Sequence, residues 1–239
     1  MLVEVPSLTT DQMIAVDRAM MEDFHIELIQ MMENAGRNLA NLARQRFLDG
    51  NARDRQIAVL AGTGGNGGGA LVCARRLHNW GADVRVFITK LDSDFTPVPA
   101  HQLDILRRIN VPVAQVESLP ASVELIIDGV IGYSLKGHPR GSAADLIRWA
   151  NNQAAPILAL DAPSGLDTTT GTVFDPAIRA AATMTLALPK EGLRSPSALE
   201  FVGELYLADI SVPPALYASA ALALQVGPIF AESEILRLN

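Results

Sequence analysis

The feature that most constrains the fold is a glycine-rich segment between an apolar run and a helical pattern. Six glycines occur between Gly62 and Gly69. The apolar run 57–61 before them predicts a buried strand, and helical spacing follows over 71–77. A plain turn needs one or two glycines, so we expect this one to require positive φ or the close approach of a ligand. A strand, a glycine loop and a helix in this order direct backbone N–H groups at an anion, usually a phosphate.

Apolar runs and helical patterns continue to alternate along the chain. Strands separated by helices of this length predict an α/β fold with a mostly parallel sheet covered on both faces. We find no linker, repeat or low-complexity tract, so we expect one domain over residues 1–239. The further predicted strands are 84–88, 113–116, 125–128, 156–161, 182–188 and 203–209, and the helices between them are 99–109 and 143–151.

The first 50 residues are predicted to form helices that pack on this α/β core. Thr9 and Gln12 have the spacing of a capping box at the start of the first helix. A second helical pattern covers 26–47 and contains Gly36, which indicates a close approach to the rest of the domain. The methionines of this region are best interpreted as core, with a subunit contact as the weaker alternative: Met20, Met21, Met31 and Met32.

Composition excludes several classes of function. The net charge of -7 and the pI of about 5.1 argue against a nucleic-acid or membrane-surface partner. No apolar stretch approaches the roughly 18 residues of a membrane span. Cys73 is the single cysteine, which excludes an internal disulfide and suits a reducing compartment. Residues 1–6 lack the features of a signal peptide, so we expect a cytoplasmic protein.

Polar residues follow three of the predicted strands, where the carboxyl ends of a parallel sheet hold ligands. Asn66 lies in the glycine segment, Asp128 ends one strand, and Asp161 ends another and is followed by Ser164. Asn66, Asp128 and Ser164 offer hard oxygen ligands, which suit a hard cation or ordered water. We expect no transition metal, because the four histidines form no ligand pair: His25, His78, His101 and His138.

Simpler motifs fit poorly. The glycines satisfy a G-x-G-x-x-G dinucleotide pattern, but the acid expected after the next strand is absent and Lys90 lies there, where it could face a 2′-phosphate. No Gly-Lys-Ser/Thr follows the glycines, which excludes a Walker loop. Ser164 lies in Ala-Pro-Ser-Gly, which disfavours a nucleophile elbow.

Seven segments together resemble one known family. They are Leu8–Met13, Met32–Arg37, Gly62–Arg75, Ile127–Ser134, Asp161–Asp167 and the C-terminal stretches Pro189–Leu193 and Gly203–Ile210. At these positions the sequence resembles the NAD(P)H-hydrate epimerase family, also called the YjeF N-terminal domain family. The resemblance covers most of the chain, and the combination of the glycine segment with Asp-x-Pro-Ser-Gly-Leu-Asp is specific.

The resemblance implies a Rossmann-like three-layer α/β/α sandwich and an activity on damaged nicotinamide nucleotides. The family interconverts the R and S epimers, at C6, of hydrated NADH or NADPH, so that a separate dehydratase can repair them. It also implies a potassium ion and a homodimer. From the length of 239 residues we expect this chain to lack the ADP-dependent dehydratase domain that accompanies some members.

The resemblance also assigns roles to individual residues. Asn66, Asp128 and Ser164 correspond to potassium ligands. Asp161 corresponds to the residue that contacts the hydrated ring, and we expect it to be the catalytic acid/base, since loss and return of hydroxide needs a proton shuttle. The phosphates and ribose would be held by two segments, with Gly64, Gly65, Asn66, Gly67, Gly68 and Gly69 in the first and Gly132, Tyr133, Ser134, Lys136, His138 and Arg140 in the second.

Two alternatives stay open at this point. Gly65, Gly69 and Tyr133 depart from the family pattern, which favours a catalytically impaired nucleotide-binding or scaffold member with a protein partner. An ordinary NAD(P)-dependent oxidoreductase is a weaker alternative, because it needs a catalytic Tyr-Lys or His pair that the sequence does not place.

Overall fold

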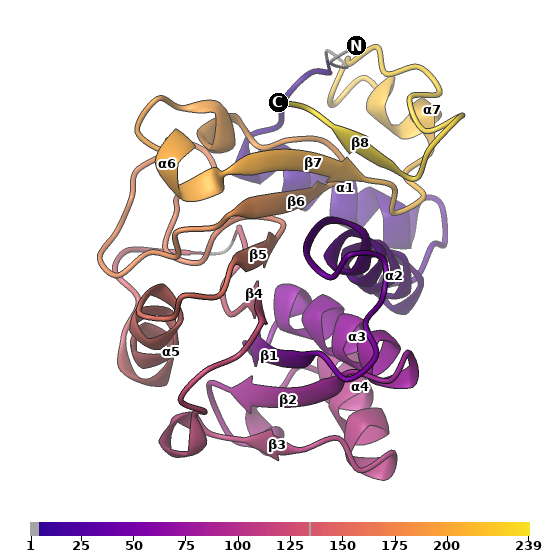
Figure 1. The fold of residues 1–239 in the computed structure, drawn as a ribbon. Helices are drawn as coiled ribbons and strands as arrows, with labels where there is room; N and C mark the ends of the chain where they lie inside the picture. Colours follow the sequence, from indigo (N-terminus) through magenta and orange to yellow (C-terminus); the bar gives the residue numbers. More distant parts are fainter. Residues whose placement is uncertain (1–4, 134) are drawn as a thin grey trace.

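A computed structural model of the protein describes residues 5–133 and 135–239, and a single sheet forms its centre (Figure 1). Within these residues the strand order is β3-β2-β1-β4-β5-β6-β7-β8. All neighbours from β3 to β7 are parallel, and β8 pairs antiparallel with β7. The strands are β1 (Gln56–Ala61), β2 (Asp83–Ile88), β3 (Val113–Ala114), β4 (Leu125–Gly129), β5 (Ile157–Leu160), β6 (Ala182–Leu186), β7 (Glu204–Ala208) and β8 (Ile235–Arg237).

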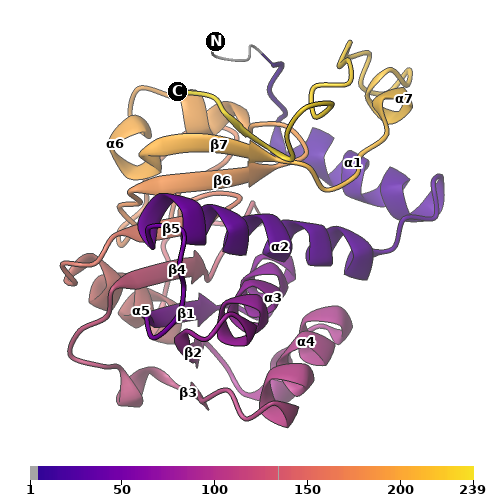
Figure 2. The same cartoon turned by 45° about the vertical axis from the view of Figure 1, so that its right-hand side comes forward.

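Helices cover both faces of this sheet and confirm the three-layer α/β/α sandwich. Helices α2, α3 and α4 lie against one face and α5 lies against the other (Figures 1 and 2). The helix α1 packs with the short α7 beside the β6–β7 end of the sheet. The helices are α1 (Thr10–Glu22), α2 (Leu28–Phe47), α3 (Gly65–Asn79), α4 (Pro97–Arg108), α5 (Gly141–Asn151), α6 (Leu199–Val202) and α7 (Pro214–Tyr217).

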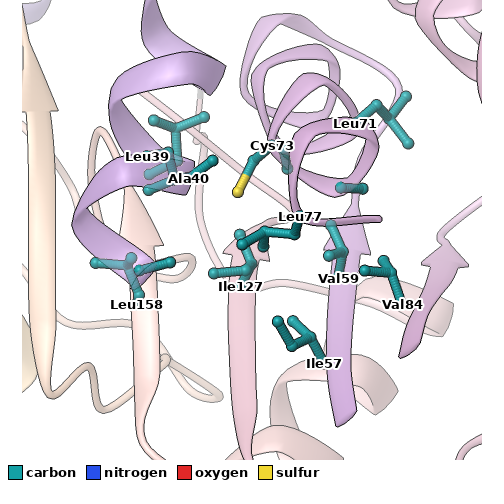
Figure 3. Packing of buried hydrophobic residues seen from close by; sticks show 14 of the residues in the cluster. Leu39, Ala40, Ile57, Val59, Leu71, Cys73, Leu77, Val84, Ile127 and Leu158 are labelled. Atoms are coloured by element: carbon teal, nitrogen blue, oxygen red, sulfur yellow. The ribbon is translucent and has the colours of Figure 1, made fainter. Parts of the chain in front are cut away.

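The alternation of side chains in β1 explains why its sequence is apolar throughout. Ile57, Val59 and Ala61 enter the core formed with α2, α3 and α4, whereas Ala58 and Leu60 enter the core formed with α5. A strand buried on both faces reads as a continuous hydrophobic run rather than an alternating one. Figure 3 shows the first of these cores, where leucines of α2 and α3 pack on β1, β4 and β5.

The N-terminal helices follow their sequence signals closely. Thr9 and Gln12 form the predicted capping box, with the backbone N–H of Gln12 donating to Thr9 Oγ1 at 3.2 Å. Helix α2 runs through Gly36 without interruption. A Cβ at Gly36 would lie 2.4 Å from Cβ of Val72, so this glycine allows α2 and α3 to approach closely, as predicted. The interpretation of the methionines as core is confirmed for the three that are buried: Met20, Met31 and Met32.

Three elements differ from the sequence predictions. Helix α3 begins at Gly65, so most of the predicted glycine loop is helical. The strand predicted over 113–116 contains only Val113 and Ala114, since the chain turns into a short 3₁₀-helix at Val116. The antiparallel strand β8 was missed because three residues at the end of the chain carry too little periodicity to distinguish a strand.

No helix within residues 5–133 and 135–239 combines the length and apolar character that a membrane crossing requires.

Candidate active site

A cavity of about 710 Å³ opens at the carboxyl ends of β1, β4 and β5. Helices α1 and α2 contribute Met13, Met21, Met31 and Met32 to its wall. The volume lies within the roughly 300–1,000 Å³ of small-molecule sites, and the position is the one where parallel sheets bind ligands. This cavity is therefore the place where the chemistry of the chain is to be sought.

The first turn of α3 forms one edge of the cavity. Gly64 is its N-cap, and a Cβ at Gly64 or Gly65 would meet no atom within 4 Å. The free N–H groups of a helix N-terminus favour an anion, because the helix dipole adds positive potential there. The predicted phosphate site is thus a helix start with two open glycines rather than a flexible loop.

The other glycines of the segment serve packing. A Cβ at Gly67 would lie 1.8 Å from the carbonyl oxygen of Gly62, and a Cβ at Gly62 would lie 2.0 Å from the carbonyl oxygen of Val130. Gly68 faces Met32 of α2, where a Cβ would lie 2.4 Å from the sulfur. None of the six glycines between Gly62 and Gly69 has positive φ, so the alternative of positive φ is wrong. The close contacts found here are with the protein's own chain, and the close approach of a ligand stays a prediction.

Asp161 lies at the end of β5, where it lines the cavity and adopts a φ of 65°. A non-glycine residue in this left-handed region costs conformational energy, and such residues cluster at functional sites. Its Oδ1 accepts hydrogen bonds from the ammonium group of Lys190, from Thr185 Oγ1 at 3.3 Å and from Leu186 N at 3.2 Å. Its Oδ2 accepts none from the described part of the chain, which leaves that oxygen for a ligand.

Lys190 is the counter-ion of Asp161 and has no solvent-exposed side-chain surface. Its ammonium group also donates to the carbonyl oxygen of Leu186 at 2.9 Å. Further hydrogen bonds help a buried ion pair to offset the cost of desolvation, and here both Asp161 Oδ1 and the Lys190 ammonium group make them. The pair therefore fixes the orientation of the Asp161 carboxylate toward the cavity.

Asp128 forms a second buried polar group, directly beside the cavity. Ser164 Oγ donates to its Oδ1 at 2.6 Å and Ser164 N donates to its Oδ2 at 2.8 Å. Burial raises the pKa of Asp128 to about 6, against the effect of these hydrogen bonds. Asn66 Nδ2 donates to the carbonyl oxygen of Leu160 at 2.7 Å. Asn66 Oδ1 packs against Gly132, where an added Cβ would lie 2.4 Å from this oxygen.

Tyr133 and Asp17 close the cavity between the β4–α5 connection and α1. Tyr133 Oη donates to Asp17 Oδ2 at 2.6 Å. Burial raises the pKa of Asp17 above its ordinary value, and it also raises the pKa of the Tyr133 phenol. Tyr133 forms part of the cavity wall, and a volume of about 710 Å³ remains beside it. The tyrosine side chain therefore does not fill the site.

The structure brings most of the sequence-predicted site residues together. Asp128 and Ser164 lie behind the cavity wall. Gly68 and Lys136 do not line the cavity, and His138 accepts a hydrogen bond from Asp175 N at 3.1 Å, outside the lining. Ser134 lies outside the described residues. The predicted residues that do line the cavity are Gly64, Gly65, Asn66, Gly67, Gly69, Gly132, Tyr133, Arg140 and Asp161.

Sequence reasoning assigned no role to two residues that complete the site, Asp17 and Lys190. Asp17 falls between Val16 and Met20 on the face of α1 that turns inward, and a carboxylate beside an apolar stripe is a signal that could have been used. Lys190 belongs to a segment that resembles the family, but its pairing with Asp161 depends on the crossover between β5 and β6 and has no signature in local sequence.

Comparisons with known proteins agree on one family. The family model described as YjeF-related protein N-terminus matches residues 28–192. A protein from Dehalogenimonas lykanthroporepellens named NAD(P)H-hydrate epimerase is 39% identical over 219 residues, which cover 91% of this chain and 87% of that protein. A second protein of that name, from Truepera radiovictrix, is 37% identical, with coverage of 86% and 90%.

Longer proteins and a solved structure match as well. The bifunctional NAD(P)H-hydrate repair enzyme Nnr of Salinibacter ruber is 35% identical over 232 residues, and this chain spans 42% of its length. The crystal structure of yeast ynu0 (YNL200c) superposes with a TM-score of 0.81 at 25% identity, covering 98% of this chain and 100% of that one. The chain therefore belongs to the family of YjeF-related N-terminal domains.

Proposed function

We propose that this chain is an NAD(P)H-hydrate epimerase, an isomerase that interconverts the R and S forms of hydrated NADH or NADPH. The observation that carries the proposal is Asp161, a strained residue at the cavity whose Oδ1 accepts three hydrogen bonds and whose Oδ2 accepts none from the described residues. The names of the relatives support the same activity. They do not favour the catalytically impaired or scaffold alternative, and the open cavity beside Tyr133 agrees with them.

In this proposal the start of α3 binds the phosphates of the nucleotide. The N–H groups that follow Gly64 supply the anion site, and Lys90 and Arg140 line the same cavity with positive charge. The hydrated ring then lies at Asp161. The roles predicted for Gly68, Lys136 and His138 lack support in the cavity lining, so we do not include them among the contacts.

Asp161 handles the proton of the reaction. The lone pair of the ring nitrogen N1 expels the hydroxyl group at C6 as the C6–O bond breaks, and water returns to C6 on the opposite face as a new C6–O bond forms. Both events need a proton moved at the oxygen, which a carboxylate within hydrogen-bond reach can do. Lys190 holds the carboxylate in place and supplies opposite charge.

We also propose that Asn66, Asp128 and Ser164 hold a potassium ion. These residues fit the ion because all offer oxygen atoms, Asp128 is buried without a cationic side chain among the described residues, and Asn66 Oδ1 accepts no hydrogen bond from them. When bound, the ion would supply the positive charge that Asp128 lacks. A rise in the thermal unfolding temperature in potassium chloride over choline chloride at equal ionic strength would support it, and an unchanged temperature would contradict it.

The remaining sequence predictions stay proposals. A homodimer would use two exposed apolar residues, Ile14 of α1 and Phe24 just after this helix, since three of the nearby methionines are buried. Sedimentation velocity at several concentrations would test that. We retain a cytoplasmic location and one domain over residues 1–239 as further expectations.

The epimerase activity is tested by adding the purified protein to (R)-NADHX and following both epimers by chromatography. We expect the approach to equilibrium to be faster than the spontaneous rate, with the final ratio unchanged. A time course that matches the protein-free control would contradict the proposal.

A further inference from the structure

Among the described residues that line the cavity, two carry carboxylates, Asp161 and Asp17. They reach the cavity from different parts of the fold. Asp161 follows β5, whereas Asp17 lies near the middle of α1. The proposed reaction also has two sides, because the hydroxyl group leaves one face of C6 and returns to the other. The second carboxylate needs a chemical explanation.

The position of Asp17 is fixed by contacts at both ends of α1. The Thr10 N–H donates to Thr169 Oγ1 at 3.0 Å, and Leu8 N donates to the carbonyl oxygen of Pro189 at 2.8 Å, which ties the start of α1 to the chain after β5 and β6. Further along α1, Val16 and Met20 are fully buried. Asp17 is therefore presented to the cavity by a helix that is docked on the catalytic edge.

Within the described part of the chain, one hydrogen bond holds the Asp17 carboxylate. Tyr133 Oη donates to its Oδ2, and its Oδ1 accepts none from the described residues. Asp17 also makes no ion pair with them, in contrast to Asp161 and Lys190. A partly buried carboxylate with a single neutral partner costs free energy of desolvation, which a fold retains most readily at a functional site.

The surroundings of the two carboxylates suit opposite tasks. Asp161 contacts an ammonium group. Burial is the main cause that raises the pKa of Asp17, and the charge of Asp161 raises it further, whereas Tyr133 and Lys190 lower it. Tyr217 of α7 also interacts with the charge of Asp17. Two neighbouring carboxyl groups in different environments can serve as acid and base in one reaction.

We propose that Asp17 is a second catalytic residue, which handles the proton on the face of C6 opposite to that served by Asp161. The inference rests on the proposed epimerase function and deepens it. In one direction the carboxylic acid of Asp17 donates its proton to the departing hydroxyl oxygen, the C6–O bond breaks and water leaves. The N1 lone pair forms the C6–N1 double bond.

The second half of the reaction restores the ring. Water attacks C6 from the other face, Asp161 accepts its proton, the new C6–O bond forms, and the electron pair returns to N1. The net result is inversion at C6, with one proton moved from Asp17 to Asp161 and returned through solvent before the next turnover. The reverse reaction uses the two residues in exchanged roles, as microscopic reversibility requires.

The first test compares Asp17→Asn with Glu22→Gln as a matched control on the same helix. The Glu22 side chain is 62% exposed and pairs with Arg18 on the same helix. We expect Asp17→Asn to lower kcat about 100-fold with little change in KM, equally in both directions, while the control keeps the wild-type rate. Circular dichroism and the thermal unfolding temperature establish that both variants fold.

A second readout distinguishes chemistry on each face. In ¹⁸O-labelled water, the Asp17→Asn variant can still exchange the C6 hydroxyl group of one epimer, the one whose hydroxyl faces Asp161. Labelled water then adds to C6 on the face that the unlabelled hydroxyl left. We expect label to enter one epimer faster than epimerisation proceeds. A residue that merely supports the structure would slow exchange and epimerisation together, and that result would overturn the proposal.

The third test uses Tyr133→Phe, which removes the hydrogen bond to Asp17 and so raises the pKa of the Asp17 carboxyl. The acid form then persists to higher pH, and the alkaline limb of the kcat/KM profile moves upward. This test remains valid if Asp17→Asn does not fold. If the alkaline limb of the kcat/KM profile does not move, or if Asp17→Asn reacts as fast as Glu22→Gln, the role of Asp17 is overturned while the proposed function stands. A wild type without activity overturns the proposed function, and this inference with it.

Discussion

At the scale of single residues, the site depends on buried charges that the backbone holds in place. Asp161 has a φ of 65° at the end of β5, and the ammonium group of Lys190 contacts its carboxylate out of reach of solvent. Removing one partner of such a pair leaves an uncompensated charge in a medium of low dielectric. Fold stability and catalysis are therefore linked through this pair.

We predict that Lys190→Met lowers the free energy of unfolding by about 3–5 kcal/mol and greatly slows epimerisation. The reason is that the Asp161 carboxylate stays buried without its counter-ion. Urea unfolding monitored by circular dichroism measures the first effect. The double variant Asp161→Asn/Lys190→Met serves as the control and should recover much of the stability without activity. Equal stability of Lys190→Met and wild type would refute this role for the pair.

The sequence predicts some residues of the site and not others. The positions of Asp128, Asp161 and Asn66 at one edge of the sheet were predicted because each lies at or just after the end of a recognisable strand, and the carboxyl ends of parallel strands meet there. Lys190 and Asp17 were not assigned roles. Their partners lie in distant parts of the chain, as Asp17 with Tyr133 shows, and such contacts depend on how crossovers and an N-terminal helix dock.

At the scale of elements, the glycine segment has two functions that the sequence did not separate. Gly64 and Gly65 face open space at the start of α3, which suits an approaching phosphate. Gly67 and Gly68 let the helix pack against the chain around Gly62 and against α2. Sequence located the segment and its connection to β1 correctly. It did not reveal that the helix begins inside the glycines, because glycine has a low helix propensity and here packing overrides it.

Two alanine substitutions test this division. We predict that Gly67→Ala destabilises the protein by about 3 kcal/mol or more, since its Cβ would lie 1.8 Å from the carbonyl oxygen of Gly62. Gly65→Ala is the matched variant in the same helix, and its free energy of unfolding should change by less than about 1 kcal/mol. Chemical unfolding of both variants measures the difference. Similar losses in the two would show that the packing explanation is wrong.

The edge of the sheet offers a pH-dependent prediction. Hydrogen bonds from Arg46 of α2 are the main cause that lowers the pKa of Glu204 in β7 to about 2, and Tyr206 and Arg237 contribute. A depressed carboxyl pKa contributes stability above its ordinary value of 4.5 that is lost as the pH falls toward 2. Because Arg46 is 47% exposed, we expect Glu204→Gln to cost only about 1 kcal/mol at pH 7.

Unfolding of wild type and Glu204→Gln at several pH values checks this result. The two free energies should converge as the pH approaches 2. A difference that stays constant from pH 7 to pH 2 would show that the ion pair is not its cause.

At the scale of the whole molecule, the layer architecture was the most predictable feature. Apolar runs such as Ile57–Ala61 imply strands buried on both faces, and helical patterns between them imply parallel crossovers. The antiparallel β8 could not be predicted, because its three residues owe their conformation to pairing with β7 rather than to a local pattern. The cavity itself arises from the docking of α1 and α2 at the sheet edge, which no local signal specifies.

The two tryptophans report on opposite faces of the sheet. Trp80 follows α3 and packs on one core, whereas Trp149 of α5 packs on the other. If residues 1–239 form one cooperative domain, the single-tryptophan variants Trp80→Phe and Trp149→Phe should each give fluorescence and circular-dichroism transitions with one common midpoint. Separate midpoints for the two probes within one variant would indicate that the faces unfold independently.

The central claim is that Asp161 makes this cavity an epimerase site. The most direct measurement starts from purified (R)- and (S)-NADHX separately and records initial rates for wild type and Asp161→Asn. We predict that wild type brings both epimers to the same final ratio faster than the spontaneous reaction, and that Asp161→Asn is slower by about 100-fold or more. An Asp161→Asn protein that epimerises at the wild-type rate, or a wild type no faster than buffer, would contradict it.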